Sequence, residues 1–247
     1  MNTITILWLR QLKKYFRSRS RLIGSIGQPL LFLIALGFGF GPTFQAAGEG
    51  NYMNFLAPGI IAMSILFTAM FSGIEIIWDR QFGFLKETLV APVSRYEIMI
   101  GRTLGGATIA LCQGTIVFFI AMLVGFTPNL VMLPFAFVFA LLISLFFTAF
   151  GTAIASALDD MQGFQLIMNF LIMPIFFLSG ALFPLKDLPE VIYYITLIDP
   201  LTYGVDGLRG TLGAVTQFGL LTDFTVLGIA TVITLAVGSY LFSRIQV

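Results

Sequence analysis

Six long apolar runs constrain this chain more than any other feature. Each stays apolar for about twenty residues, the length at which a helix crosses roughly 30 Å of hydrocarbon. The runs cover residues 22–41, 53–78, 103–125, 132–157, 164–183 and 224–243. Barrel strands would alternate between apolar and polar positions, and these runs do not. The sequence therefore predicts an all-α polytopic membrane protein with six transmembrane helices.

Composition agrees with this class. Hydrophobic residues make up 58% of the 247 residues, charged residues make up 10%, and the mean hydropathy is +0.97. Soluble proteins carry about one quarter charged residues. We expect a single transmembrane domain over residues 1–247. The first apolar run is too long for a signal peptide and follows a long basic lead, so it is predicted to be a retained span.

The lysine and arginine residues predict the orientation, because cytoplasmic segments are enriched in them. Of the 13 basic residues, six precede the first run, four lie in residues 79–102, and Arg244 lies in the tail. Only Lys186 and Arg209 fall on the opposite side of the predicted membrane. We therefore expect both termini to be cytoplasmic.

Residues 1–21 are predicted to form a cytoplasmic amphipathic helix. Apolar residues recur at spacings of three and four from Ile4 onwards, and basic residues, among them Arg10 and Lys13, hold the other side. This pattern is typical of a helix in the membrane interface. This helix could anchor the protein to anionic lipid, or it could form a surface that binds a partner protein.

A charged cytoplasmic segment, residues 79–102, lies between the second and third spans. A push on it would tilt both helices, so it is a candidate coupling segment for a separate motor protein. Its candidate contact residues are Phe84, Glu87, Pro92, Arg95 and Tyr96. Alternatively, these charges only solvate a loop and satisfy the positive-inside rule.

The last outer loop, residues 184–223, is predicted to hold two short helices. Asp187 followed by Pro189, and Asp199 followed by Pro200, are typical helix starts. Each helix has an apolar side that should be buried: Leu188, Val191, Ile192 and Ile195 on the first, and Leu201, Val205, Leu208 and Leu212 on the second. Both are too short to span, so we expect them to enter the outer leaflet or to cap the bundle.

Polar residues inside the spans are candidates for a transport path, because they are costly in lipid. Gln28 of the first span and Asn169 of the fifth are the two candidates. They could equally join helices by hydrogen bonds. Glu75 is expected to extend to the inner interface. Gly106, Ala110 and Gly114 form a small-residue stripe that is expected to be structural.

The sequence also excludes several kinds of chemistry. It contains no G-x-x-x-x-G-K-[ST] motif, so the chain is not expected to bind ATP phosphates. It has no histidine and one cysteine, Cys112, so neither a disulfide framework nor a metal site is expected. We expect no catalytic residue and no cofactor bound by this chain.

The chain resembles the permease subunit of ABC-2 type ABC transporters over essentially its whole length. The likeness rests on the six-span plan, on the segment from Asp79 to Arg95, and on the outer-loop residues Pro200, Tyr203 and Arg209. Gln81 departs from the acid common at its position in such permeases. Drug-resistance and nodulation-factor exporters are the most similar members.

The resemblance implies a permease in the plasma membrane of a prokaryote that exports an amphipathic drug-like or lipid-like substrate. Its implied partners are two copies of a P-loop ATPase, which would carry ATP and Mg, a second copy of this permease or a close relative, and membrane lipids. No nucleic acid is expected. A polysaccharide or glycolipid exporter is the near alternative. A passive channel or a membrane enzyme is the alternative of another class.

Overall fold

A computed structural model describes residues 3–46, 51–84, 93–186, 188–213 and 215–244. Six helices in these ranges are long and apolar enough to cross a membrane: Ile23–Ala46, Tyr52–Gln81, Arg95–Val124, Leu130–Ala157, Met161–Leu178 and Leu220–Ser243. The predicted all-α polytopic class with six spans is confirmed.

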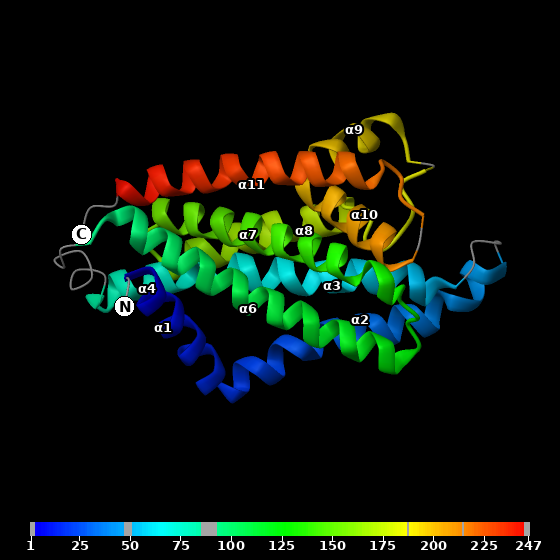
Figure 1. Cartoon of the computed structure of the whole chain (residues 1–247), viewed down its shortest axis with the longest axis horizontal. Helices are drawn as coiled ribbons and strands as arrows, with labels where there is room; N and C mark the ends of the chain where they lie inside the picture. Colours follow the sequence, from blue (N-terminus) through cyan, green and yellow to red (C-terminus); the bar gives the residue numbers. More distant parts are fainter. Residues whose placement is uncertain (1–2, 47–50, 85–92, 187, 214, 245–247) are drawn as a thin grey trace.

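The elements follow one another in a simple order. They are α1 (Thr3–Arg17), α2 (Arg19–Ala46), α3 (Tyr52–Ser72), α4 (Ile74–Gln81), α6 (Arg95–Val124), the short helix η1 (Leu130–Met132), α7 (Leu133–Ala157), α8 (Met161–Leu178), α9 (Glu190–Ile198), α10 (Pro200–Leu212) and α11 (Leu220–Ser243). Figure 1 shows an elongated bundle in which α1 leaves the long axis at an angle. We call the end that holds α4, the start of α1 and the end of α11 the terminal end, and the end that holds α9 and α10 the distal end.

Helix α3 forms the centre of the bundle and packs against α2, α6, α7 and α10. A glycine within α3 and the glycine that follows its last residue permit close backbone contacts. A Cβ atom at Gly59 would collide with the carbonyl of Ala181, and one at Gly73 with the carbonyl of Gly151. The predicted second span corresponds to Tyr52–Gln81, within which α3 ends and α4 begins on either side of Gly73. The interruption lies where the α7 backbone leaves no room for a side chain.

Helix α6 starts earlier than the predicted third span. Ser94 accepts a hydrogen bond from the Glu97 amide (3.1 Å), and the Glu97 carboxylate accepts one from the Ser94 amide (3.3 Å). This capping box satisfies the free amides of the first turn, so the helix begins at Arg95. The later part of the predicted coupling segment is therefore helical.

The distal helices match the predictions only in part. Helix α10 begins as predicted, because Asp199 accepts a hydrogen bond from the Leu201 amide (2.9 Å), and its predicted apolar side is buried. The protein itself does not cover the apolar side of α9: Val191 is 72% exposed and Ile195 46% exposed, so entry of α9 into the outer leaflet stays a prediction. Within the part of the chain that the structure describes, α9 packs mainly against α8 and α10, so its apolar side stays open. Asp187 lies outside the described residues.

The small-residue stripe on α6 is structural, as predicted. A Cβ atom at Gly106 would lie 2.6 Å from the Ser72 hydroxyl, and one at Gly114 would lie 2.6 Å from Ile65. Both neighbours belong to α3. The missing side chains let α6 and α3 approach closely along their middle turns.

Candidate coupling site and translocation path

Helix α1 is fastened along the side of α6. The Trp8 indole donates a hydrogen bond to the Thr108 hydroxyl (3.0 Å), and Leu7 is buried in the contact. A Cβ atom at Gly105 would lie 2.7 Å from the Gln11 side chain, so small residues on α6 permit this approach. Within the predicted 1–21 segment the helix α1 covers Thr3–Arg17, and it is a packed part of the bundle.

Charged side chains join three helices at the terminal end. Asp79 of α4 accepts hydrogen bonds from Arg10 of α1 (3.2 Å) and from Arg102 of α6. Asp79 and Arg102 are both buried, at 5% and 4% exposure. A carboxylate this deep is stable only with charged partners. We call Arg10, Asp79 and Arg102 the terminal clamp.

Glu75, one turn before Asp79, is buried as well. The Lys14 ammonium group lies 3.6 Å from the Glu75 carboxylate and 5.5 Å from the centre of the Trp78 ring. The expectation that Glu75 extends to the interface was wrong. Helix α1 covers the glutamate, which the pattern of the second span alone could not indicate.

Arg80 connects α4 to the junction of α7 and α8. Its guanidinium group binds the Asp159 carboxylate and donates to the carbonyls of Leu158 (3.1 Å) and Ser156 (3.3 Å). These carbonyls lie at the end of α7, where helix geometry leaves them without intrahelical partners. Together with the terminal clamp, α4 is tied to α1, α6 and α7.

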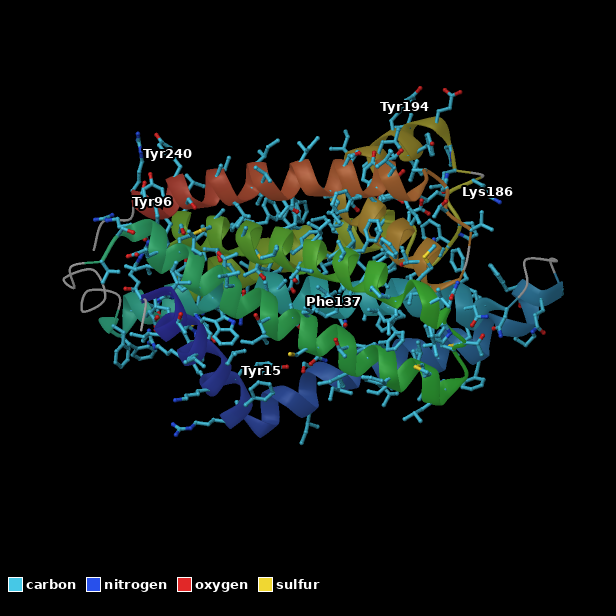
Figure 2. All side chains as sticks on the ribbon, viewed as in Figure 1. Tyr15, Tyr96, Phe137, Lys186, Tyr194 and Tyr240 are labelled. Carbon is cyan, nitrogen blue, oxygen red and sulfur yellow. The ribbon has the colours of Figure 1, made fainter. Side chains whose placement is uncertain are left out.

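The predicted coupling residues do not all take the same place in the structure. Arg10 belongs to the terminal clamp, whereas Lys13 is exposed and lines a groove of about 660 Å³ along α1. Phe84 and Tyr96 are 51% and 56% exposed, and Figure 2 shows Tyr96 at the terminal end near Tyr240.

Arg95 takes a role that the sequence did not indicate. Its guanidinium donates a hydrogen bond to the carbonyl of Ser243 (2.7 Å), at the last turn of α11. The first turn of α6 and the last turn of α11 are thereby connected. Glu87 and Pro92 lie outside the described residues, so their coupling role stays a prediction.

Gln28, one of the two candidate path residues, lines a cavity of about 230 Å³ between α2 and α3. Polar and aromatic side chains share this cavity, among them Tyr15, Ser25, Ser64 and Phe67. Asn169 is exposed on α8 and is not among the lining residues. The two candidates therefore do not form one site within this chain.

Sequence reasoning missed Gln113 of α6. It is fully buried and accepts hydrogen bonds from Tyr15 (3.0 Å) and from the Ser25 hydroxyl (3.0 Å), and it donates to the Ser25 carbonyl (3.0 Å). It fixes the corner between α1 and α2 beside the Gln28 cavity. The criterion that selected Gln28, an amide inside a span, would also have selected Gln113.

The outer-loop residues Pro200, Tyr203 and Arg209 belong to α10 and stabilise the distal end. Pro200 occupies the first turn, and the Tyr203 hydroxyl donates to the Leu197 carbonyl (2.9 Å). Arg209 is buried, donates to the Gly180 carbonyl (2.9 Å) and stacks on Phe55 at 3.8 Å. Burial lowers the pKa of Arg209 to about 10, against the opposing effect of Asp206.

Comparison with known families agrees with this arrangement. The family model described as ABC-2 type transporter matches residues 2–212, which include the terminal clamp and all of α10. The chain belongs to the ABC-2 type transporter family. It is accordingly a membrane permease component of an ABC transporter, and a permease of this family is not itself catalytic but works with an ATP-binding subunit.

Three curated relatives show the extent of the similarity. The ABC-2 permease is 34% identical over 200 residues to transport permease ycf38 of Cyanophora paradoxa, covering 76% of this chain and 66% of the relative. It is 28% identical to Nodulation protein J of Rhizobium leguminosarum bv. viciae, covering 77% and 74%. It is 29% identical to transport permease ycf38 of Porphyra purpurea, covering 83% and 72%.

Proposed function

We propose that this ABC-2 permease is the membrane half of an ATP-driven exporter for an amphipathic, drug-like or lipid-like substrate. In the working complex two copies of this chain, or one copy and a close relative, join two copies of a P-loop ATPase. ATP and Mg bind to the ATPase, and this chain holds no cofactor. The complex lies in the plasma membrane of a prokaryote, with the terminal end in the cytoplasm.

The observation that carries the proposal is the set of buried ionic contacts around α4. Helix α4 ends and helix α6 begins at the terminal end, and α4 is bound to α1 through Asp79 and to the α7–α8 junction through Arg80. A pull on this connection would therefore move several spans together. Packed helices respond to such a force by switching between discrete arrangements.

Coupling would proceed from the ATPase to the bundle. ATP binding brings the ATPase subunits together, and they displace the segment from residue 79 to residue 102. Exposed Phe84 and Tyr96, with Glu87, Pro92, Arg95 and Lys13, form the contact surface in this scheme. ATP can shift the equilibrium between the two arrangements of the bundle only as far as the complex binds ATP more tightly in one arrangement than in the other.

The substrate class is inferred from the Gln28 cavity. Its lining combines hydroxyl and amide groups with the rings of Phe67 and Phe71, which suits a molecule that has both a polar and an apolar part. Asn169 would approach this path only from a second permease copy. A polysaccharide or glycolipid substrate is the alternative within the family. The names of the relatives, nodulation protein and transport permease, do not separate these substrates.

Affinity purification in mild detergent, followed by mass spectrometry, tests the proposal. A P-loop ATPase should copurify with the wild-type chain in stoichiometric amount. Tyr96→Ala should reduce the retained ATPase at least severalfold, because it removes an exposed aromatic contact at the terminal end. The matched control is Tyr194→Ala, since Tyr194 is 65% exposed but lies at the distal end (Figure 2).

The possible outcomes separate the function classes. If Tyr96→Ala and Tyr194→Ala both retain as much ATPase as the wild-type chain, the proposed contact surface is contradicted. A chain that purifies alone and moves solute without ATP would favour the passive-channel alternative. Turnover of a substrate by the isolated chain would instead favour the membrane-enzyme alternative.

A further inference from the structure

The groove along α1 combines basic and apolar side chains on one side of the helix. The described residues that line it recur at spacings of three and four: Ile6, Leu9, Arg10, Lys13, Lys14 and Arg17. Such spacings place side chains on the same face of a helix. Trp8 and Tyr15 lie on the opposite face, where they hydrogen-bond to α6. We call the lined surface, of about 660 Å³, the α1 groove.

The four cations of the α1 groove differ in what neutralises them. Arg10 and Lys14 lie 3.2 and 3.6 Å from the buried carboxylates of α4. Lys13 and Arg17 are exposed and form no ion pair with any described residue. Because these two residues are four positions apart on one helix, their side chains are neighbours on its surface. A single anionic group can therefore contact both positive charges.

Exposed apolar side chains lie around these two cations. Ile6 lines the groove and is 51% exposed, and Phe16, beside Arg17 in the sequence, is 54% exposed. Ile23, in the first turns of α2, is 73% exposed. Basic residues combined with exposed apolar residues are typical of a helix in the membrane interface. A ligand that fits this surface needs both a negative charge and an apolar part.

The corner between α1 and α2 brings the cations close to the start of a span. Helix α1 ends at Arg17, and the membrane-crossing part of α2 begins at Ile23, six residues later. Six residues of helix cover about 9 Å. Figure 1 shows that α1 leaves the long axis of the bundle at this corner. An acidic protein surface would match the charges, but it would not account for the apolar side chains that continue into a span.

We propose that the α1 groove binds an anionic phospholipid from the membrane leaflet at the terminal end. Lys13 and Arg17 contact the phosphate of the headgroup, and the acyl chains lie against the exposed apolar side chains of α1 and of the first turns of α2. A zwitterionic lipid gains less from these cations, because its headgroup carries a positive charge of its own. The proposal does not rest on the exporter function, although Lys13 is also part of the contact surface proposed above.

Native mass spectrometry of the purified full chain measures which lipid it retains. The chain is released from nanodiscs with equal amounts of phosphatidylglycerol and phosphatidylcholine that carry identical acyl chains. The wild-type chain should retain phosphatidylglycerol in roughly fivefold excess, because each surface cation favours an anionic lipid. The double variant Lys13→Gln/Arg17→Gln should bring the ratio of the two lipids close to one. Arg17→Lys, which keeps the charge, should preserve the excess.

A second double variant, Lys186→Gln/Arg244→Gln, is the matched control. It removes the same net charge from two exposed cations that are not among the lining residues of the α1 groove. Its lipid ratio should equal that of the wild-type chain. An equal loss of the excess in both double variants would show a general effect of net charge and would overturn the proposal. A wild-type ratio close to one would overturn it as well.

An acidic surface of the ATPase is the competing occupant of the α1 groove. In that case Lys13→Gln/Arg17→Gln would keep the wild-type lipid ratio but would retain less ATPase in the copurification described above. This outcome would overturn the lipid assignment. The lipid measurement uses the permease alone, so failure of the exporter proposal would leave its result unaffected.

Discussion

The two ends of this permease bury charged groups in opposite ways. At the terminal end a buried acid, Asp79, is matched by two arginines from two other helices. At the distal end the buried Arg209 donates to a backbone carbonyl instead, and the buried Asp206 carboxylate accepts hydrogen bonds from backbone amides. The terminal end joins helices by opposite charges, whereas at the distal end these buried charged groups bind the backbone of neighbouring segments. The difference shows that a buried charge in this protein is matched either by an opposite charge from another helix or by backbone groups.

Removing Asp79 should have the largest effect. Asp79→Ala leaves the buried Arg102 without its carboxylate, and loss of one partner from a buried pair costs about 3–5 kcal/mol. Thermal unfolding in detergent would measure this loss. The control is Asp159→Ala at the same end: its side chain is 91% exposed, so the loss of its pairing with Arg80 should cost less than about 1 kcal/mol. Equal losses in the two variants would contradict the buried clamp.

Removing Arg209 should have a smaller effect at the other end. Arg209→Met keeps the length of the side chain but deprives the buried Gly180 carbonyl of its donor, at a cost of about 2–3 kcal/mol. The same unfolding measurement applies, with Lys186→Met as the control because Lys186 is an exposed cation of the same end (Figure 2). A loss as large as that of Asp79→Ala would show that the distal end depends on ionic pairing as strongly as the terminal end does.

The smallest effect is expected at Asp199, the N-cap of α10. Burial raises the pKa of Asp199 to about 7, so its contribution to stability falls as the pH rises from its usual pKa of 3.8 towards 7. Asp199→Asn retains an oxygen for the Leu201 amide but carries no charge. At about pH 5 the variant should be more stable by about 1–2 kcal/mol. The difference should vanish below about pH 3, and a difference independent of pH would instead indicate a change in packing.

Some of the candidate site could be predicted from the sequence, and some could not. The exposed positions of Lys13 and Tyr96 follow from amphipathic and charged local patterns. The start of α10 follows from Asp199 and Pro200, because helix capping needs only neighbouring residues. Gln113 was within reach of the argument used for Gln28 and was overlooked.

Other features depend on residues that are distant in the chain. The break at Gly73 arises where the α7 backbone passes, and the open side of α9 reflects how few helices cover it. Glu75 is buried because α1 lies over it. None of these neighbours can be read from the segment itself, so local periodicity could not indicate the interruption, the open side of α9 or the burial of Glu75.

The sequence by itself determined that this protein crosses a membrane with six helices. Each span must be long enough to cross the hydrocarbon layer and must pair its own backbone amides within a helix. Both requirements apply to one segment at a time, so the length of an apolar run is enough to predict a span. Only the tertiary structure decided which charges meet. Asp79 binds Arg102, 23 residues away in the sequence, and Arg10, 69 residues away. The packing of α1, α4 and α6 brings these side chains together. The free energy of a buried charge depends on those neighbours and not on its own segment.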